Sequence, residues 1–184
     1  MVRLDTVTKK ISDGITAFVS GAYSMTNKTM AGTTNNVESE ALASTVAFRV
    51  RRGTPQGLNN NNWNKILFAT ELFDLGGDFD NGANSRFTAP VKGIYCFSSA
   101  IHISGVANGD RALLALNKNG TEEARGQDMI CGAGEIGVTV NTLLNLNAND
   151  YIDVQLYLGS ASGKNTVGGS GQLCYFTGFL IGKY

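Results

Sequence analysis

Apolar side chains alternate with small or polar ones along several segments between Thr45 and the C-terminus. The segment 93–104 is the clearest case. One of its faces carries Tyr95, Phe97, Ser99, Ile101 and Ile103. The other face carries Ile94, Cys96, Ser98, Ala100 and His102. Because side chains on a β-strand point alternately to opposite sides, the pattern predicts a strand with its first face in a core and its second face partly covered.

Two later segments, 136–146 and 152–158, show the same period. The first places Ile136, Val138, Val140, Leu144 and Leu146 on one face, and the second places Ile152, Val154, Leu156 and Leu158 on one face. Turn sequences lie between the three segments, at 117–120 after the segment 93–104 and at 147–150 before the segment 152–158. The 23 glycines against two prolines agree with short strands joined by turns. Strands that have one face toward solvent and are joined by turns predict an antiparallel sandwich or barrel.

Aromatic residues, an aspartate and a G-x-Y-x-F strand follow one another in order between residues 68 and 97. The series consists of Phe68, Asp74, Phe79, Phe87, Gly93, Tyr95 and Phe97. The segments 149–156 (NDYIDVQL) and 176–180 (FTGFL) complete the pattern. These motifs resemble those of the C1q and tumour-necrosis-factor superfamily. The resemblance implies an all-β jelly-roll sandwich of two antiparallel sheets, and a tight three-fold trimer around an aromatic axis.

The C-terminal segment 173–181 is apolar on both faces. One side carries Leu173, Tyr175, Phe179 and Ile181, and the other carries Cys174, Phe176 and Leu180. A single sandwich has core space for only one side, and each large apolar side chain left in water forfeits about 1.5–3 kcal/mol. The segment therefore predicts a subunit contact. With the trimer that the resemblance implies, the aromatic candidates for core or axis positions are Tyr95, Tyr157, Tyr175, Phe176 and Phe179.

Residues 1–44 are polar and rich in Thr, Ser and Asn. Such a composition buries little surface, so we expect an N-terminal arm that is extended or disordered unless it lies on a partner, followed by a domain over 45–184. The anchoring candidates within the arm recur at helical spacing and are Val7, Ile11, Ile15 and Phe18. Their β-branched and Thr-rich surroundings make a strand the alternative to a short helix. Collagen-like G-x-y repeats are absent from the sequence, which argues against an animal complement-type protein.

The formal net charge is zero, which gives no long-range electrostatic signal for nucleic acid or an anionic membrane as a partner. No segment approaches the roughly 20 apolar residues that span a bilayer, and the first residues lack the apolar stretch of a secretory signal. Either the numbering begins after processing, or the protein is made and used without standard export, as a virion protein made in the host cytoplasm would be. Its three cysteines, Cys96, Cys131 and Cys174, leave at least one thiol unpaired. We expect Cys96 and Cys174 to be buried, inert thiols, because their neighbours in the strands are apolar, with a disulfide as the alternative.

Catalytic motifs are missing from the sequence. It contains neither a G-x-S-x-G nucleophile elbow nor a phosphate-binding G-x-x-x-x-G-K-[S/T] loop, and its one histidine, His102, falls on the polar side of a predicted strand. We therefore expect neither enzyme activity nor a cofactor. Asp74, Asp78 and Asp80 lie close together in a loop-rich stretch. We expect these aspartates to stabilise turns, and a calcium site is the alternative.

Three functional hypotheses follow for a trimeric, non-enzymatic module. The first is a bacteriophage virion surface protein, either a capsid-decorating cement protein or a short fibre head, attached through residues 1–44 to the major capsid protein or another virion protein. The second is a receptor- or carbohydrate-binding head that uses the loops 59–62, 105–110 and 160–171, with Trp63 and Tyr157 as stacking surfaces for a host glycan. The third is a secreted C1q-like ligand at the cell surface, for which the cysteines offer no paired framework.

Overall fold

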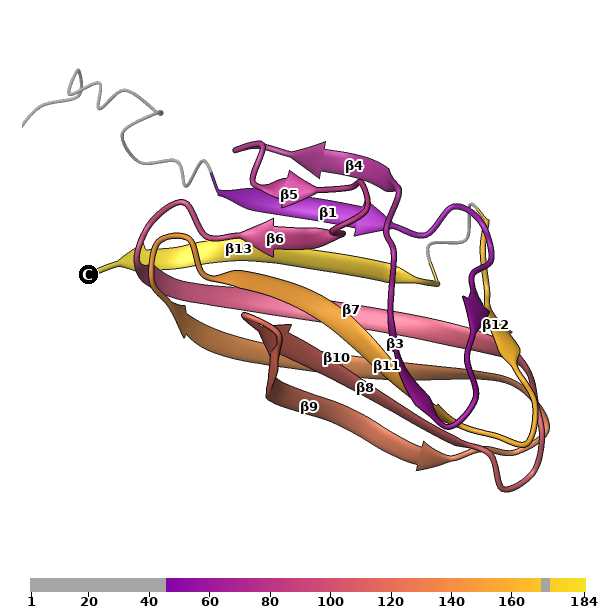
Figure 1. The fold of residues 1–184 in the computed structure, drawn as a ribbon. Helices are drawn as coiled ribbons and strands as arrows, with labels where there is room; N and C mark the ends of the chain where they lie inside the picture. Colours follow the sequence, from indigo (N-terminus) through magenta and orange to yellow (C-terminus); the bar gives the residue numbers. More distant parts are fainter. Residues whose placement is uncertain (1–45, 170–172) are drawn as a thin grey trace, which may run out of the picture. The chain divides into compact units, whose positions relative to one another are not determined.

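The computed structural model describes residues 46–169 and 173–184 (Figure 1). The regular structure in these two ranges consists of β-strands in two antiparallel sheets. None of the described residues forms a helix long and apolar enough to span a bilayer. The arm candidates Val7, Ile11, Ile15 and Phe18 lie outside the described residues, so the arm conformation and the boundary after residue 44 stay predictions.

The first sheet, called sheet A, is built around the long strand β7. Its strands follow the order β2 (Gly57–Leu58), β12 (Lys164–Thr166), β7 (Gly93–Val106), β13 (Tyr175–Lys183), β1 (Ala47–Arg51) and β4 (Thr70–Asp74), with β10 (Gly134–Leu146) also paired to β7. The pairing of β10 with β7 extends from Gly134 opposite Val106 to Leu146 opposite Gly93. Strands β12 and β13 pair with β7 as well. The N-terminal and C-terminal strands of the domain, β1 and β13, are therefore neighbours.

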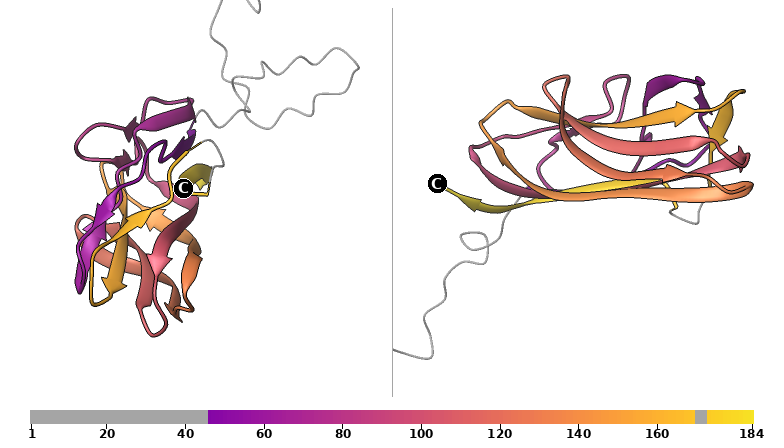
Figure 2. Two further views of the ribbon diagram at one scale, coloured as in Figure 1. Left: turned by 90° about the vertical axis from the view of Figure 1, so that its right-hand side faces the viewer. Right: turned by 90° about the horizontal axis from the view of Figure 1, so that it is seen from below.

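The second sheet, called sheet B, lies against sheet A. Its strands follow the order β5 (Phe79–Asp80), β6 (Arg86–Thr88), β11 (Tyr151–Gly159), β8 (Arg111–Lys118) and β9 (Thr121–Ile130), with β3 (Asn62–Lys65) also paired to β11. The two sheets form separate layers when the molecule is seen from below (Figure 2). Neighbours such as β1 with β13 and β6 with β11 are far apart in sequence, as in a jelly roll. The predicted fold class is confirmed.

Phenylalanine rings fill the space between the two sheets at one end. The ring centroids of Phe48 and Phe176 lie 5.0 Å apart in an edge-to-face arrangement. Phe87 stacks on Phe48 at 5.0 Å, and Phe97 stacks on Phe176 at 5.8 Å. Such ring pairs add about 0.5–1.5 kcal/mol each beyond the area that they bury. This cluster joins β1, β6, β7 and β13, and so links the two sheets.

The predicted alternation along β7 is confirmed. Its inward side chains, Tyr95, Phe97, Ser99, Ile101 and Ile103, are buried. On the other face Ile94, Cys96, Ser98 and His102 are half-buried, while Ala100 is buried. The Tyr95 hydroxyl donates a hydrogen bond of 2.7 Å to the Val91 carbonyl, and burial raises the pKa of this hydroxyl. A polar group can enter this core because it keeps a partner there.

The predicted turns are tight and use left-handed backbone. The β8–β9 hairpin turns at Asn119 (φ 52°) and Gly120 (φ 83°), and the connection from β10 to β11 turns at Asn149 (φ 70°). Asn and Gly adopt positive φ more readily than other residues, which explains why these sequences end one strand and start the next.

Candidate interaction surfaces

The outward face of sheet A carries an apolar row that crosses four strands. Ala47 on β1 pairs with Phe179 on β13, Phe179 pairs with Cys96 on β7, and Cys96 pairs with Leu143 on β10. Directly paired residues of an antiparallel sheet point to the same side, so these four side chains form one continuous strip. Phe179 is 48% exposed and Leu143 is 59% exposed. We call these four residues the apolar row.

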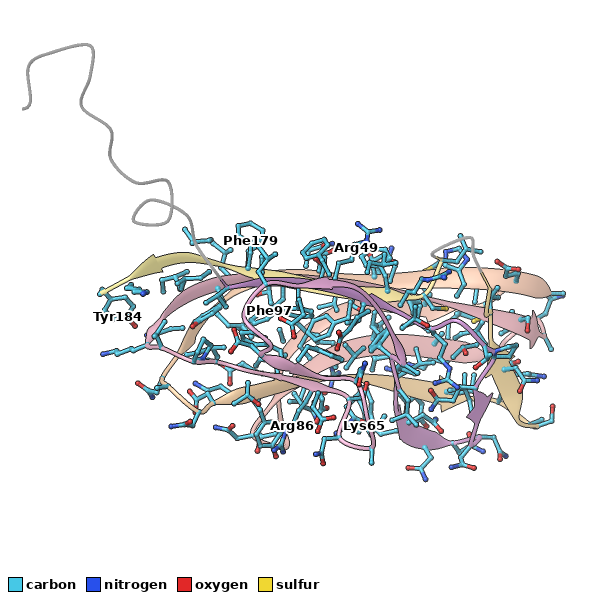
Figure 3. The ribbon with its side chains drawn as sticks, turned by 90° about the horizontal axis from the view of Figure 1, so that it is seen from above. Arg49, Lys65, Arg86, Phe97, Phe179 and Tyr184 are labelled. Carbon is cyan, nitrogen blue, oxygen red and sulfur yellow. The ribbon has the colours of Figure 1, made fainter. Side chains whose placement is uncertain are left out.

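Further residues extend this face. Ile181, two positions beyond Phe179 on β13, is 54% exposed. On the other side of the row, the Arg49 guanidinium lies 5.0 Å from the centre of the Tyr175 ring. Figure 3 shows Phe179 and Arg49 pointing away from the sandwich on one side, with Phe97 between the sheets and Lys65 and Arg86 on the opposite side. The face therefore has an apolar end and a more polar end.

The five aromatic candidates occupy three different places. Tyr95 and Phe176 are buried in the core, whereas Tyr175 and Phe179 belong to the outward face of sheet A. Tyr157 lies on the outward face of sheet B, opposite Trp63, so it belongs to neither group. The opposite burial of Phe176 and Phe179 agrees with a closing strand that is apolar on both sides.

Sequence analysis missed Leu143, and for Cys96 it placed the side chain correctly on the partly covered face but was wrong to expect a buried thiol. The consecutive leucines Leu143 and Leu144 interrupt the alternation of β10, and this signal places one leucine on each face. Cys96 is half-buried on the outward face, because its position on β7 alternates with Tyr95 and Phe97. Cys131 and Cys174 are buried, and burial raises the pKa of both thiols. All three are free thiols, so the disulfide alternative is not realised in the described structure.

The outward face of sheet B carries a second surface feature, a pocket of about 180 Å³. We call it the aromatic pocket, and its lining residues are Trp63, Arg111, Leu113, Arg125 and Tyr157. The rings of Trp63 and Tyr157 have centroids 5.7 Å apart and planes inclined at 62°. They meet because Tyr157 on β11 pairs directly with Trp63 on β3. The pairing of Tyr157 with Leu113 brings β8 beneath the same site.

The two arginines of the aromatic pocket are each held by a carboxylate. Arg111 donates two hydrogen bonds to Asp128, the one from Nε being 2.8 Å long, and Arg125 donates two of 2.9 Å to Glu122. The hydrogen bonds and charge of Arg111 lower the pKa of Asp128. Bidentate pairs of this kind fix the orientation of the guanidinium plane.

The loops 59–62 and 105–110 and the described part of the third loop, 160–169, approach one another at one end of the sandwich, at the right of Figure 1. Leu58, just before the loop 59–62, pairs with Lys164 of β12, and Lys164 Nζ lies 3.6 Å from Asp110 Oδ2. The same Asp110 oxygen accepts the Ala107 N–H at 2.9 Å. The third loop is described as far as residue 169. Asp110 therefore links its own loop to the segment that follows residue 160.

Acid is expected to weaken this connection between the loops. The hydrogen bond from the Ala107 N–H, followed by those from Ser160 and Lys164, lowers the pKa of Asp110 below its ordinary value of 3.8. Because the folded-state pKa is the lower one, the stabilisation is complete above the unfolded-state pKa and is lost as the pH falls through the folded-state pKa. The urea midpoint should therefore fall less between about pH 6 and about pH 2 in Asp110→Asn than in the parent protein. Equal losses in the two proteins would contradict this account.

The aspartates near β4 stabilise a turn. Asp74 accepts backbone N–H groups from Gly77, Asp78 and Phe79 at 2.8–3.2 Å. Asp80 accepts hydrogen bonds from Gly82 and from the Asn84 side chain. Burial, and then the charge of Asp74, raises the pKa of Asp78. Within residues 46–169 and 173–184, no group of three or more His, Cys, Asp and Glu side chains is placed to hold a metal ion.

The single histidine lies at the polar end of sheet A. The Nδ1 atom of His102 is 3.0 Å from Oε1 of Glu135, and its ring covers Gly137 on β10. This position belongs to the same outward face as the apolar row. The arrangement places the imidazole at a surface between two strands, as the strand pattern indicates.

Comparisons with known proteins agree with this architecture. The model of a family described as the C1q domain matches residues 47–181. The globular domain of zebrafish complement 1qA is similar at 18% identity and a TM-score of 0.55, over 76% of this chain and 99% of that one. Eiger TNF from S. frugiperda is similar at 8% identity and a TM-score of 0.56, over 76% and 94%. Murine APRIL is similar at 11% identity and a TM-score of 0.53, over 73% and 98%.

Proposed function

Because the chain belongs to the C1q domain family, we propose that it is a non-enzymatic head that works as a homotrimer assembled through the outward face of sheet A. The single observation that carries this proposal is the apolar row of Ala47, Phe179, Cys96 and Leu143. In one protomer, the large side chains of this row and Ile181 remain about half exposed. Covering each of them in an interface gains roughly 1 kcal/mol or more.

A second copy of the chain is the occupant that this face suits best. The face is a nearly continuous sheet surface, and its apolar strip is flanked by Arg49 and Tyr175 at one side. An apolar centre with a polar border is the usual anatomy of a stable subunit interface. The inward face of β13 is already used by the core, so only its outward residues are available for assembly.

Sedimentation equilibrium of the full chain tests this proposal. We expect one species with three times the protomer mass throughout the micromolar range, because assembly buries the apolar row. A well-behaved monomer at low micromolar concentration would show that the face is left in water, and the proposed function would fail.

We further propose that the trimer is a virion surface component of a bacteriophage, as a capsid-decorating cement protein or a short fibre head. Residues 1–44, with Val7, Ile11, Ile15 and Phe18 as anchors, would attach it to the major capsid protein or another virion protein. The polar composition of this span supports an arm that orders on a partner. Three arms on one trimer would raise the overall affinity through a high effective concentration.

Binding of purified trimers to undecorated particles tests the virion proposal. The full chain should co-sediment with the particles, and a chain that lacks residues 1–44 should remain in the supernatant as an intact trimer. Failure of the full chain to bind would exclude the decorating role without affecting the trimer itself.

A receptor- or carbohydrate-binding head is the second candidate function. The observation that favours it is the aromatic pocket, in which Trp63 and Tyr157 meet on the outward face of sheet B. This surface is on the opposite side of the sandwich from the apolar row, so a trimer would leave it accessible. Both roles can therefore belong to one molecule.

A further inference from the structure

We propose that the aromatic pocket binds a neutral saccharide, with one pyranose ring packed in the corner between Trp63 and Tyr157 and its hydroxyls bonded to the paired arginines and carboxylates of β8 and β9. This inference rests on the receptor-binding head proposed above and names the ligand class and the site. It is independent of the trimer and of the arm.

The two rings have the geometry of a corner. Their planes are inclined at 62° with centroids 5.7 Å apart, so the two rings meet edge to face and do not stack on each other. Trp63 remains 38% exposed, which leaves indole surface open to a ligand. A pyranose presents C–H groups on one side of its ring and hydroxyls at its edge. An open aromatic surface beside polar groups matches that division, and binding sites generally combine an apolar wall with a few placed polar groups.

Trp63 is held in this exposed position by its buried neighbour Asn64. The Asn64 amide nitrogen donates to the carbonyls of Asn59 and Asn62 at 3.0 Å each, and its oxygen accepts the Asn59 N–H at 2.7 Å. Because neighbouring residues on a strand point to opposite sides, burying Asn64 forces Trp63 outward. A side chain fixed by its backbone loses less freedom when a ligand binds. The corner is thus preformed.

The polar part of the pocket favours a neutral ligand over an anionic one. Arg111 is paired with Asp128 and Arg125 with Glu122, so the four charges cancel. Each guanidinium has five N–H groups and uses two on its carboxylate, which leaves three as donors. The carboxylate oxygens accept hydrogen bonds from hydroxyls but repel an acidic sugar. Tyr157 is also close to Arg111, whose guanidinium lies 6.0 Å from the ring centre.

The same features disfavour a nucleic acid ligand. Single-strand binding sites combine aromatic stacking with cations that neutralise the phosphates. Here both arginines already have acidic partners, and the whole chain has no net charge. Stacking without phosphate neutralisation suits a neutral ring better than a nucleotide.

The chain has one tryptophan, so its fluorescence reports on this pocket alone. We would titrate the full chain with methyl β-glucopyranoside, methyl β-galactopyranoside and N-acetylglucosamine, and apply it to an array of neutral and acidic glycans. We expect a saturable change of the Trp63 emission with at least one neutral sugar, and retention on neutral glycans of the array. Tyr157→Ala, which keeps the reporter, should weaken binding about two- to tenfold through the loss of one aromatic wall.

The matched control is Phe73→Ala, which removes another exposed aromatic side chain, on β4 of sheet A. It should bind the sugar as the parent does. Trp63→Ala should lose array binding, and if this variant unfolds, Tyr157→Ala decides the question by itself.

Several outcomes would overturn the inference. They are the absence of binding to every neutral glycan, binding restricted to acidic glycans or to a single-stranded oligonucleotide, and neutral-glycan binding that persists unchanged in Trp63→Ala and Tyr157→Ala. The last result would keep the receptor-binding function and reject only this pocket. A stable trimer without any glycan binding would reject both the carbohydrate-binding role and the pocket while leaving the trimeric head intact.

Discussion

Leu143→Asp is expected to convert the proposed trimer into monomers. Leu143 ends the apolar row and is 59% exposed in the protomer, so the substitution is tolerated by a single folded subunit. In the proposed trimer it would remove roughly 1 kcal/mol or more of apolar burial, since part of Leu143 is already covered in the protomer, and place a carboxylate in an apolar contact, once in every subunit. Because the loss occurs in all three subunits, the sum exceeds the free energy that holds together an interface of ordinary affinity.

Sedimentation velocity measures this result directly, and circular dichroism shows whether the subunit remains folded. The control is Ile130→Asp, a change of the same kind at an exposed apolar position on β9 of sheet B. It should leave the trimer intact. If Leu143→Asp sediments as the parent trimer does, the apolar row is not the interface.

Phe176→Ala is expected to cost about 3–5 kcal/mol of folding free energy, whereas Phe179→Ala should cost less than about 1 kcal/mol. Both residues lie on β13, three positions apart, but Phe176 is fully buried and Phe179 is 48% exposed. Removing the Phe176 ring opens a cavity beside Phe48 and Phe97. Removing the Phe179 ring takes away surface that only an interface would cover.

Urea unfolding in the Leu143→Asp background separates these effects, because unfolding of a monomer does not depend on protein concentration. In the parent background, Phe179→Ala should instead weaken the trimer, as seen in dissociation on dilution. Equal losses of folding free energy for Phe176→Ala and Phe179→Ala would contradict the division of β13 into a core face and an assembly face.

For the segments 93–104, 136–146 and 152–158, the side of the strand that enters the core was predictable from the sequence. Tyr95 and Phe97 alternate with Ile94 and Cys96, and a strand has a period of two residues, so burying one pair sends the other outward. The same period of two residues places Phe176 and Phe179 on opposite faces of their strand. The turns were predictable as well, since Asn119 and Gly120 adopt a backbone that few other residues adopt readily.

The residues that form the aromatic pocket and the apolar row were harder to predict from the sequence. Asp74 was recognised as a turn residue, and Trp63 and Tyr157 were proposed as stacking surfaces, but no pattern indicated that these two rings meet. Arg111 and Arg125 had no signal at all, because each is an ordinary charged residue on its own strand. The only sign of Leu143 in the sequence was that two leucines stand side by side, where an alternating strand would have a single apolar residue.

The amino-acid sequence by itself determined the strand character of the four alternating segments, the turns at 117–120 and 147–150, and which side chains share a face, because all of these depend on neighbours within a few residues. Only the tertiary structure decided that Ala47, Cys96, Leu143 and Phe179 form one row, and that Trp63, Tyr157 and Arg111 form one pocket. These groupings depend on which distant strands pair and in which register. That choice is made by the packing of the two sheets as a whole, where every side chain must fit at once.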